Sequence, residues 1–153
     1  MIKYFPAEDI EKRVADLIKV LGMDHVDSSR VGLIRSRGST AYRTLARCHG
    51  MSKIMQLGMK TRPFYVIEVI SEQFDRLDEE EQTKTLIHEL MHIPKNFGGG
   101  FRHHDFVNRR NIDGMYKMYK MRTNIDGYVK TIGPPSSKAG NTEGKRPGVF
   151  RFF

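Results

Sequence analysis

The pattern His88-Glu89-Leu90-Met91-His92 contains residue types that bind a metal ion and use it. Residues four apart in a helix lie on one face about one turn apart, so the two imidazoles can bind a single ion. From the next position round the helix, the Glu89 carboxylate can reach a water molecule at the metal's open position without binding the metal itself. Neutral imidazoles hold zinc, the ion lowers the pKa of its bound water, and a carboxylate accepts the proton as that water attacks a carbonyl. The pattern therefore predicts His88 and His92 as ligands of Zn²⁺ and Glu89 as the general base.

A catalytic zinc ion usually has three protein ligands, so a third is expected downstream. His103 and His104 follow Gly98-Gly99-Gly100, a flexible turn that can return the chain to the metal. Adjacent residues point in different directions, so both cannot easily serve, and one of the two is the predicted third ligand. Asp105 is a carboxylate alternative, or a partner that orients an imidazole.

The remaining histidines and the cysteine are predicted to have structural roles. His25 lies in an expected loop and His49 in an expected strand, so neither is predicted as a ligand. Cys48 is the only cysteine, which excludes an intramolecular disulfide and a thiolate-rich zinc ribbon made by this chain alone. No sequence feature supplies Cys48 with an activating base, so we interpret it as a packed residue.

One helix and three strands are expected before the metal-binding pattern. Apolar residues at helical spacing predict a helix over 7–21, ended by Gly22. Aromatic and β-branched residues predict the clearest strand over 64–70. Residues 31–34 are typical of a strand followed by a turn, and 46–57 of a second, interrupted strand.

The predicted ligands lie on a helix over 78–92. Asp78 can act as its N-cap, with Glu81 completing a capping box, and Pro94 stops the helix just beyond His92. After a glycine-rich loop, helical spacing resumes over 105–121. The elements therefore predict an α+β fold with a helix after the metal-binding pattern.

Composition indicates a soluble globular protein. The chain has 153 residues, 39% hydrophobic and 29% charged, which suits one domain with its own core. We predict one metallopeptidase domain over 1–130 and a basic Gly/Pro/Ser-rich tail over 131–153. No stretch approaches the roughly 20 apolar residues of a membrane span, and no secretory signal is readable, so a cytoplasmic location without membrane contact is expected.

Positive charge gathers in the last third of the chain. From residue 101 to the end there are 11 Lys or Arg against 4 Asp or Glu, a net of 11 − 4 = +7 out of +8. This region has no regular aromatic interleaving, so we favour a solubilising tail and a solvated helix face. Weak binding of nucleic acid through it is the alternative.

Three runs together resemble a known family: 64–70, then 86–95 with its His-Glu-x-x-His-Ile-Pro pattern, then 97–104. Over roughly residues 8 to 122 the chain is similar to the metallopeptidases of archaea and phages, and to SprT-type and minimal gluzincin-like zinc peptidases. The resemblance implies a zincin-like core with a backing helix, a small twisted, mostly antiparallel sheet, an active-site helix and a following C-terminal helix. It also implies a peptide or protein substrate. The family's downstream histidine lies two residues after an arginine, which matches His104 and ranks it above His103.

Three functions are open at this point. The preferred one is a zinc metallopeptidase. The first alternative is an SprT-like peptidase that acts on nucleic-acid-bound proteins through the basic C-terminal third, and the second is a zinc-binding domain without peptidase turnover. The substrate preference and the oligomeric state are not predicted.

Overall fold

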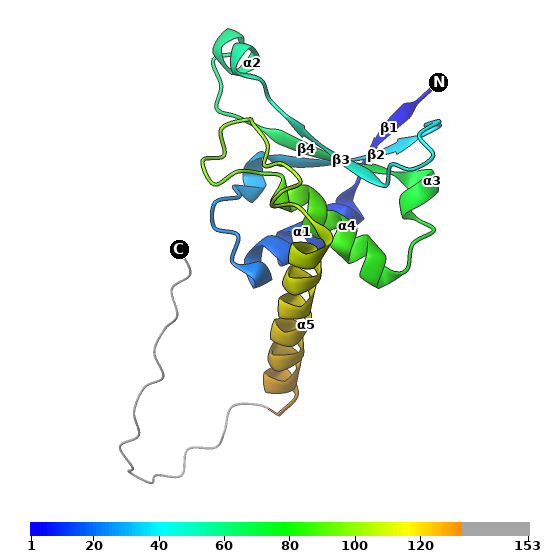
Figure 1. The fold of residues 1–153 in the computed structure, drawn as a ribbon, viewed down its shortest axis with the longest axis vertical. Coiled ribbons are helices and arrows are strands. Elements are labelled where there is room, and N and C mark those ends of the chain that lie inside the picture. The colour runs from blue at the N-terminus through cyan, green and yellow to red at the C-terminus, as the bar shows by residue number, and fades with distance from the viewer. Residues whose placement is uncertain (133–153) are drawn as a thin grey trace.

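The computed structural model describes residues 1–132 and has one mixed sheet with helices packed against it (Figure 1). Its strands are β1 (Lys3–Pro6), β2 (Val31–Arg37), β3 (Ala46–Gly50) and β4 (Tyr65–Ile70). Its helices are α1 (Glu8–Leu21), the 3₁₀ turn η1 (Ser28–Arg30), α2 (Lys53–Gly58), α3 (Ser71–Phe74), α4 (Glu79–Met91) and α5 (Arg109–Ile132). The predicted α+β class is confirmed.

The sheet has the strand order β1-β2-β4-β3, which leaves β3 at an edge. β1 pairs antiparallel with β2, and β3 pairs antiparallel with β4, whereas β2 and β4 are parallel. Two of the three pairings are therefore antiparallel, as the prediction of a mostly antiparallel sheet required. β4 is central and its inward side chains Tyr65, Ile67 and Val69 are fully buried.

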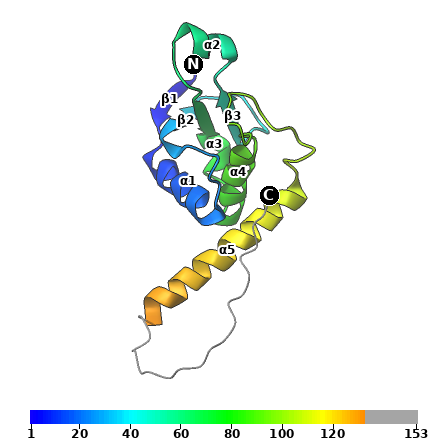
Figure 2. The same cartoon turned by 90° about the vertical axis from the view of Figure 1, so that its left-hand side faces the viewer.

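Helices α1 and α4 lie on the same face of the sheet (Figures 1 and 2). The predicted apolar stripe of α1, including Ile10, Val14 and Leu17, is buried in the core that also contains Ile67. Gly22 ends α1 in the left-handed conformation with φ 65°, and its N–H donates to the carbonyl of Lys19. Burial of one helix face thus matches the periodicity of the sequence.

Helix α4 begins as predicted, because the Asp78 side chain accepts a hydrogen bond of 2.8 Å from the backbone N–H of Glu81. Its last helical residue is Met91, with His92 as the C-cap and Pro94 beyond. The helix that carries the candidate ligands therefore has a defined start and end.

Helix α5 begins later and runs further than the predicted 105–121. Its start is set by Asn108, whose side-chain oxygen accepts from the N–H of Asn111 at 3.0 Å. It continues to Ile132, past the predicted domain end at residue 130. Along α1 it is held by Tyr119, which donates to Asp16 at 2.8 Å. The rest of the predicted tail lies outside the described residues.

The predicted strand over 46–57 is wrong in its second half. β3 ends at Gly50, and residues 53–58 form α2, capped by Ser52, which accepts from the N–H of Met55. The apolar residues of this segment suggested a strand, but they are not buried: Ile54 is 78% exposed and Leu57 69% exposed. Figure 2 shows α2 projecting from the end of the sheet.

Two further differences concern the other edge of the sheet. β1 was not predicted, because all four of its residues are exposed and it contains Pro6. Its pairing with β2 also explains why β2 continues through Arg37 instead of turning after residue 34: Lys3 and Phe5 pair with Arg37 and Arg35. Short exposed strands carry little hydrophobic pattern to read.

Candidate metal centre

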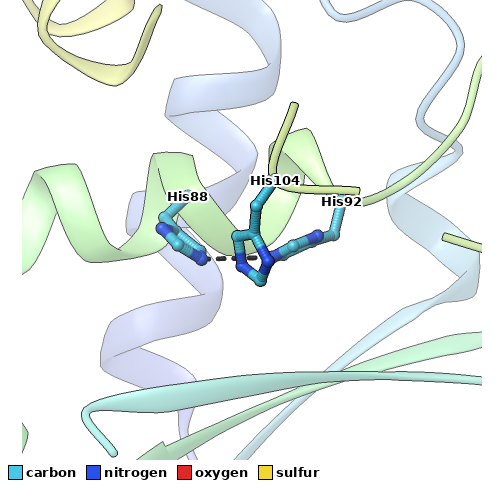
Figure 3. Close-up of side chains that lie close together, drawn as sticks. All are labelled: His88, His92 and His104. Carbon is cyan, nitrogen blue, oxygen red and sulfur yellow. Dashed lines mark hydrogen bonds between the residues drawn. The ribbon is translucent and has the colours of Figure 1, made fainter. Parts of the chain in front are cut away.

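Helix α4 presents His88 and His92 on one face, one turn apart (Figure 3). Their Nε2 atoms lie 3.1 Å apart and the ring centroids are separated by 4.9 Å. Both side chains are half-buried. The local helix geometry alone therefore aims two imidazole nitrogens at one point.

The chain after α4 returns His104 to the same point (Figure 3). One nitrogen from each of His88, His92 and His104 lies within 4.8 Å of the others, and this is the one such group of His, Cys, Asp or Glu among residues 1–132. His103 is exposed and does not belong to it, and its carbonyl accepts from the N–H groups of Phe106 and Val107. The side chain of Asp105 accepts from the N–H of Phe106 and lies outside the group as well.

The orientation of His92 is set by the backbone of Arg102. Nδ1 of His92 lies 2.7 Å from the Arg102 carbonyl oxygen, and the Arg102 N–H donates to the His92 carbonyl at the same distance. A carbonyl oxygen can only accept, so Nδ1 carries the proton. Nε2 is then the free nitrogen, and it faces His88 and His104.

The loop that brings in His104 is held by a tyrosine from the central strand. The hydroxyl of Tyr65 donates to the Gly100 carbonyl and accepts from the Gly99 N–H, both at 2.8 Å. Its ring packs edge-on against Phe97 and Phe101, with centroid distances of 4.8 and 6.2 Å. Sequence reasoning missed this role, since Tyr65 lies more than thirty residues before the loop and no local pattern links them.

A second anchor, also missed from the sequence, comes from α2. Nε2 of Gln56 donates to the carbonyls of Met51 and Gly98, each at 2.8 Å. Gly99 sits against this anchor with φ 97°, and a Cβ there would overlap the Met51 carbonyl oxygen. The loop therefore requires glycine at this position both for its backbone conformation and for its close approach.

Burial keeps one of the candidate ligands, His88, in the form that binds metals. Desolvation, together with the charges that His92 and His104 would carry, lowers the pKa of His88 to about 4. His88 is therefore neutral near pH 7, and a neutral imidazole has a nitrogen lone pair free for a metal ion.

Glu89 lies buried between α4 and the edge strand β3, with 7% of its surface exposed. Burial raises its pKa to about 7, although a hydrogen bond from the Cys48 backbone acts in the opposite direction. Burial, and then the charge of Glu89, raise the pKa of the Cys48 thiol to about 12, so this cysteine is not a thiolate at neutral pH.

An open cleft of about 750 Å³ adjoins the three histidines. His88, Glu89 and His104 are among the residues that line it, together with residues 43–46, further residues of α4, and residues 107–109, 112 and 113 around the start of α5. A carboxylate with a raised pKa thus faces the same space as two of the imidazoles.

His25 and His49 lie away from the three-histidine group. Nε2 of His25 is 3.2 Å from the Ile93 carbonyl oxygen, and burial lowers the pKa of this ring. His49 pairs with Glu68 at 2.8 Å on the face of the sheet opposite the helices. Neither belongs to the three-histidine group.

The fold and the site together define an α+β protein with a three-histidine cluster suited to a metal ion. The family model described as putative phage metallopeptidase matches residues 2–130, and the chain belongs to this family. Comparisons with the curated proteins and with the solved structures give no match. The family implies a hydrolase that uses a metal ion, and the relation to SprT-type peptidases stays a prediction.

Within residues 1–132, no helix combines the length and the apolar character that a membrane span requires. Nucleic-acid binding by the basic C-terminal third also stays a prediction, since much of that region lies outside the described residues.

Proposed function

We propose that this protein is a zinc-dependent metallopeptidase that hydrolyses peptide bonds, with His88, His92 and His104 as metal ligands and Glu89 as general base. One observation carries the proposal: three imidazole nitrogens converge, and two of these histidines line an open cleft together with the buried carboxylate of Glu89. Membership of the metallopeptidase family supports it.

The donor set fits zinc. Three neutral imidazoles without a thiolate are a ligand set of catalytic zinc sites, in which a fourth position stays open. Two nitrogens about 2.0–2.1 Å from one tetrahedral ion lie roughly 3.3 Å apart, close to the 3.1 Å between Nε2 of His88 and Nε2 of His92. Zinc held there would lower the pKa of a bound water molecule and polarise the substrate carbonyl.

Glu89 is suited to move the protons of the reaction. It follows His88 directly, so its side chain leaves the helix about 100° away from the ligand and faces the cleft. A carboxylate with a pKa of about 7 can accept a proton from the attacking water and release it again to the leaving amine. A base with a much lower pKa would hold that proton too weakly.

The edge strand β3 offers a place for an extended peptide. On its inner side the Leu45 carbonyl accepts from Ile70, and the Met51 N–H donates to Phe64. By the alternation of an antiparallel pair, the backbone groups of Ala46 and Cys48 then point away from β4. The Cys48 backbone reaches Glu89 on this side, so a strand paired with β3 would pass directly over the general base.

The alternative of a zinc-binding domain without turnover is less well supported. A purely structural zinc site is closed by four protein ligands, whereas three converge here beside an open cleft.

Zinc content and cleavage of a mixed peptide library test the proposal, with Glu89→Gln as the matched variant. We expect about one zinc ion per chain in both proteins, and a fall in kcat/KM of about 10²- to 10⁴-fold in the variant. Equal cleavage by the two proteins would rule out the proposed base, and wild-type protein that holds no zinc would rule out the metal site.

A further inference from the structure

The cleft beside the histidines has an apolar floor. Val107, just before α5, and Ile112, within α5, are 1% and 8% exposed, and Ala46 of β3 lines the same cleft. Thr85 of α4, one helical turn before Glu89, also lines the cleft. The stem of a substrate side chain that enters this cleft is removed from water. An apolar stem is favoured here, because burying apolar surface stabilises the complex.

The rim of the cleft is charged, but part of this charge is already neutralised. Nζ of Lys84 lies 2.7 Å from Glu80 and 3.0 Å from Asp113. Its positive charge is therefore shared between two carboxylates and is poorly available to a ligand.

Two arginines of the rim remain free to bind an anion. Arg43 precedes β3, and Arg109 is the first residue of α5, so they come from different elements of the cleft wall. Both are exposed, and within residues 1–132 neither takes part in an ion pair. Glu81 is the carboxylate of the rim that opposes them, and Lys84 with its two carboxylates adds 1 − 2 = −1, so the rim sums to 2 − 1 − 1 = 0. An anion would therefore be bound by the two guanidinium groups themselves and not by a net positive charge of the rim.

Arg109 lines the same cleft as His88 and His104. It lies one turn of α5 before Asp113 and lowers the pKa of that carboxyl, after the larger effect of Lys84. Asp113 bonds Lys84, which lies one turn of α4, about 6 Å, from His88.

We propose that this cleft is a substrate subsite that selects a side chain with an apolar stem and a terminal carboxylate, which in a peptide is glutamate, next to the scissile bond. The inference rests on the proposed function for the position of that bond. The stem contacts Val107 and Ile112, and the carboxylate accepts charge-assisted hydrogen bonds from Arg43 and Arg109, whose planar guanidinium groups match it.

The test uses a peptide that the wild-type protein cleaves, with each residue flanking the scissile bond changed in turn to Glu, Gln, Leu or Lys. We expect kcat/KM for Glu to exceed that for Gln by about tenfold at one of the two positions, with Lys lowest. Arg109→Glu and Arg43→Glu should each reduce the Glu/Gln ratio, and the double variant should prefer Lys. Arg110→Glu is the matched control, because it changes the net charge equally at an exposed neighbour that does not line the cleft.

Equal rates for Glu and Gln at both positions, or equal effects of Arg109→Glu and Arg110→Glu, would overturn the subsite. Binding of the same peptides to zinc-loaded Glu89→Gln protein separates this outcome from failure of the proposed function. A Glu preference in binding, with no cleavage by the wild type, supports the subsite and contradicts the peptidase. Cleavage without any preference contradicts the subsite alone.

Discussion

Two glutamates of this protein expose similarly little surface, yet their pKa values are shifted in opposite directions. Glu89 beside the histidines is 7% exposed and Glu68 on the other face of the sheet is 5% exposed. Burial raises the pKa of Glu89 to about 7. For Glu68 burial acts in the same direction, but hydrogen bonds and the charges of His49 and Arg47 outweigh it and lower its pKa.

The difference has two causes: the carboxyl of Glu89 is the more deeply desolvated of the two, and the partners differ. Glu68 has a histidine at 2.8 Å and an arginine at 3.8 Å, so it is the buried carboxylate of an ion-pair network. Glu89 has the backbone of Cys48 and no cationic side chain within ion-pair distance among the described residues. A carboxylate without a cation keeps its affinity for a proton, which a general base requires and a structural ion pair does not.

The comparison extends to the histidines, and here we expect the largest effect. His104→Ala should lower zinc affinity by at least about 100-fold, because it removes one of three proposed ligands. His49→Ala, which removes the partner of Glu68, should leave zinc affinity unchanged. His103→Ala is the adjacent control and should also have no effect. Competition with a chromogenic chelator measures the zinc affinity of all three variants. A loss of zinc in His103→Ala, with none in His104→Ala, would make His103 the third ligand in place of His104.

The second prediction concerns stability against pH in metal-free protein. The pKa of Glu89 is raised from 4.5 to about 7 in the folded state, so ionising this carboxyl is less favourable in the folded than in the unfolded chain. The free energy of unfolding therefore falls as the pH rises between these two values. Glu89→Gln removes this cost. The metal-free variant should be more stable than wild type by up to about 3 kcal/mol at pH 8, with the advantage gone below pH 4.5.

Glu68→Gln should behave in the opposite way, since the pKa of Glu68 is lowered. Its ionised form contributes stability above the unfolded pKa of 4.5, and that contribution is lost as pH falls through the folded pKa. The variant should therefore be less stable than wild type at pH 7, by about 1–2 kcal/mol, and this deficit should shrink in acid. Urea unfolding at several pH values measures the stability of both variants. If the stability of the two variants relative to wild type changed with pH in the same way, the proposed contrast between Glu89 and Glu68 would be wrong.

The smallest effect is expected at the loop anchor. Tyr65→Phe keeps the ring that packs on Phe97 but removes the hydroxyl that holds Gly99 and Gly100. We expect zinc affinity to fall by about tenfold, as for other groups that orient metal ligands. The absorption spectrum of the Co²⁺-substituted protein should shift as His104 loosens. An unchanged spectrum with lowered stability would assign Tyr65 a role in folding only.

Much of helix α4 could be predicted from the sequence because its determinants are local. Asp78 caps the third residue after it, and His88 and His92 are one helical turn apart wherever the helix lies. The same reasoning failed for α2, where apolar residues at 54 and 57 suggested a strand although they are exposed. The same reasoning also missed β1. All residues of β1 are exposed, so its pairing with β2 leaves no hydrophobic pattern in the sequence.

The sequence by itself determined which residues can bind a metal ion and that two of them share a helix face, because a helix positions side chains through contacts four residues apart. Only the tertiary structure placed His104 rather than His103 beside them, since the loop between is held by Tyr65 of β4 and Gln56 of α2. It also decided that Glu89, unlike Glu68, is buried without a cation. Both outcomes depend on contacts between segments far apart in the chain, which no local pattern encodes.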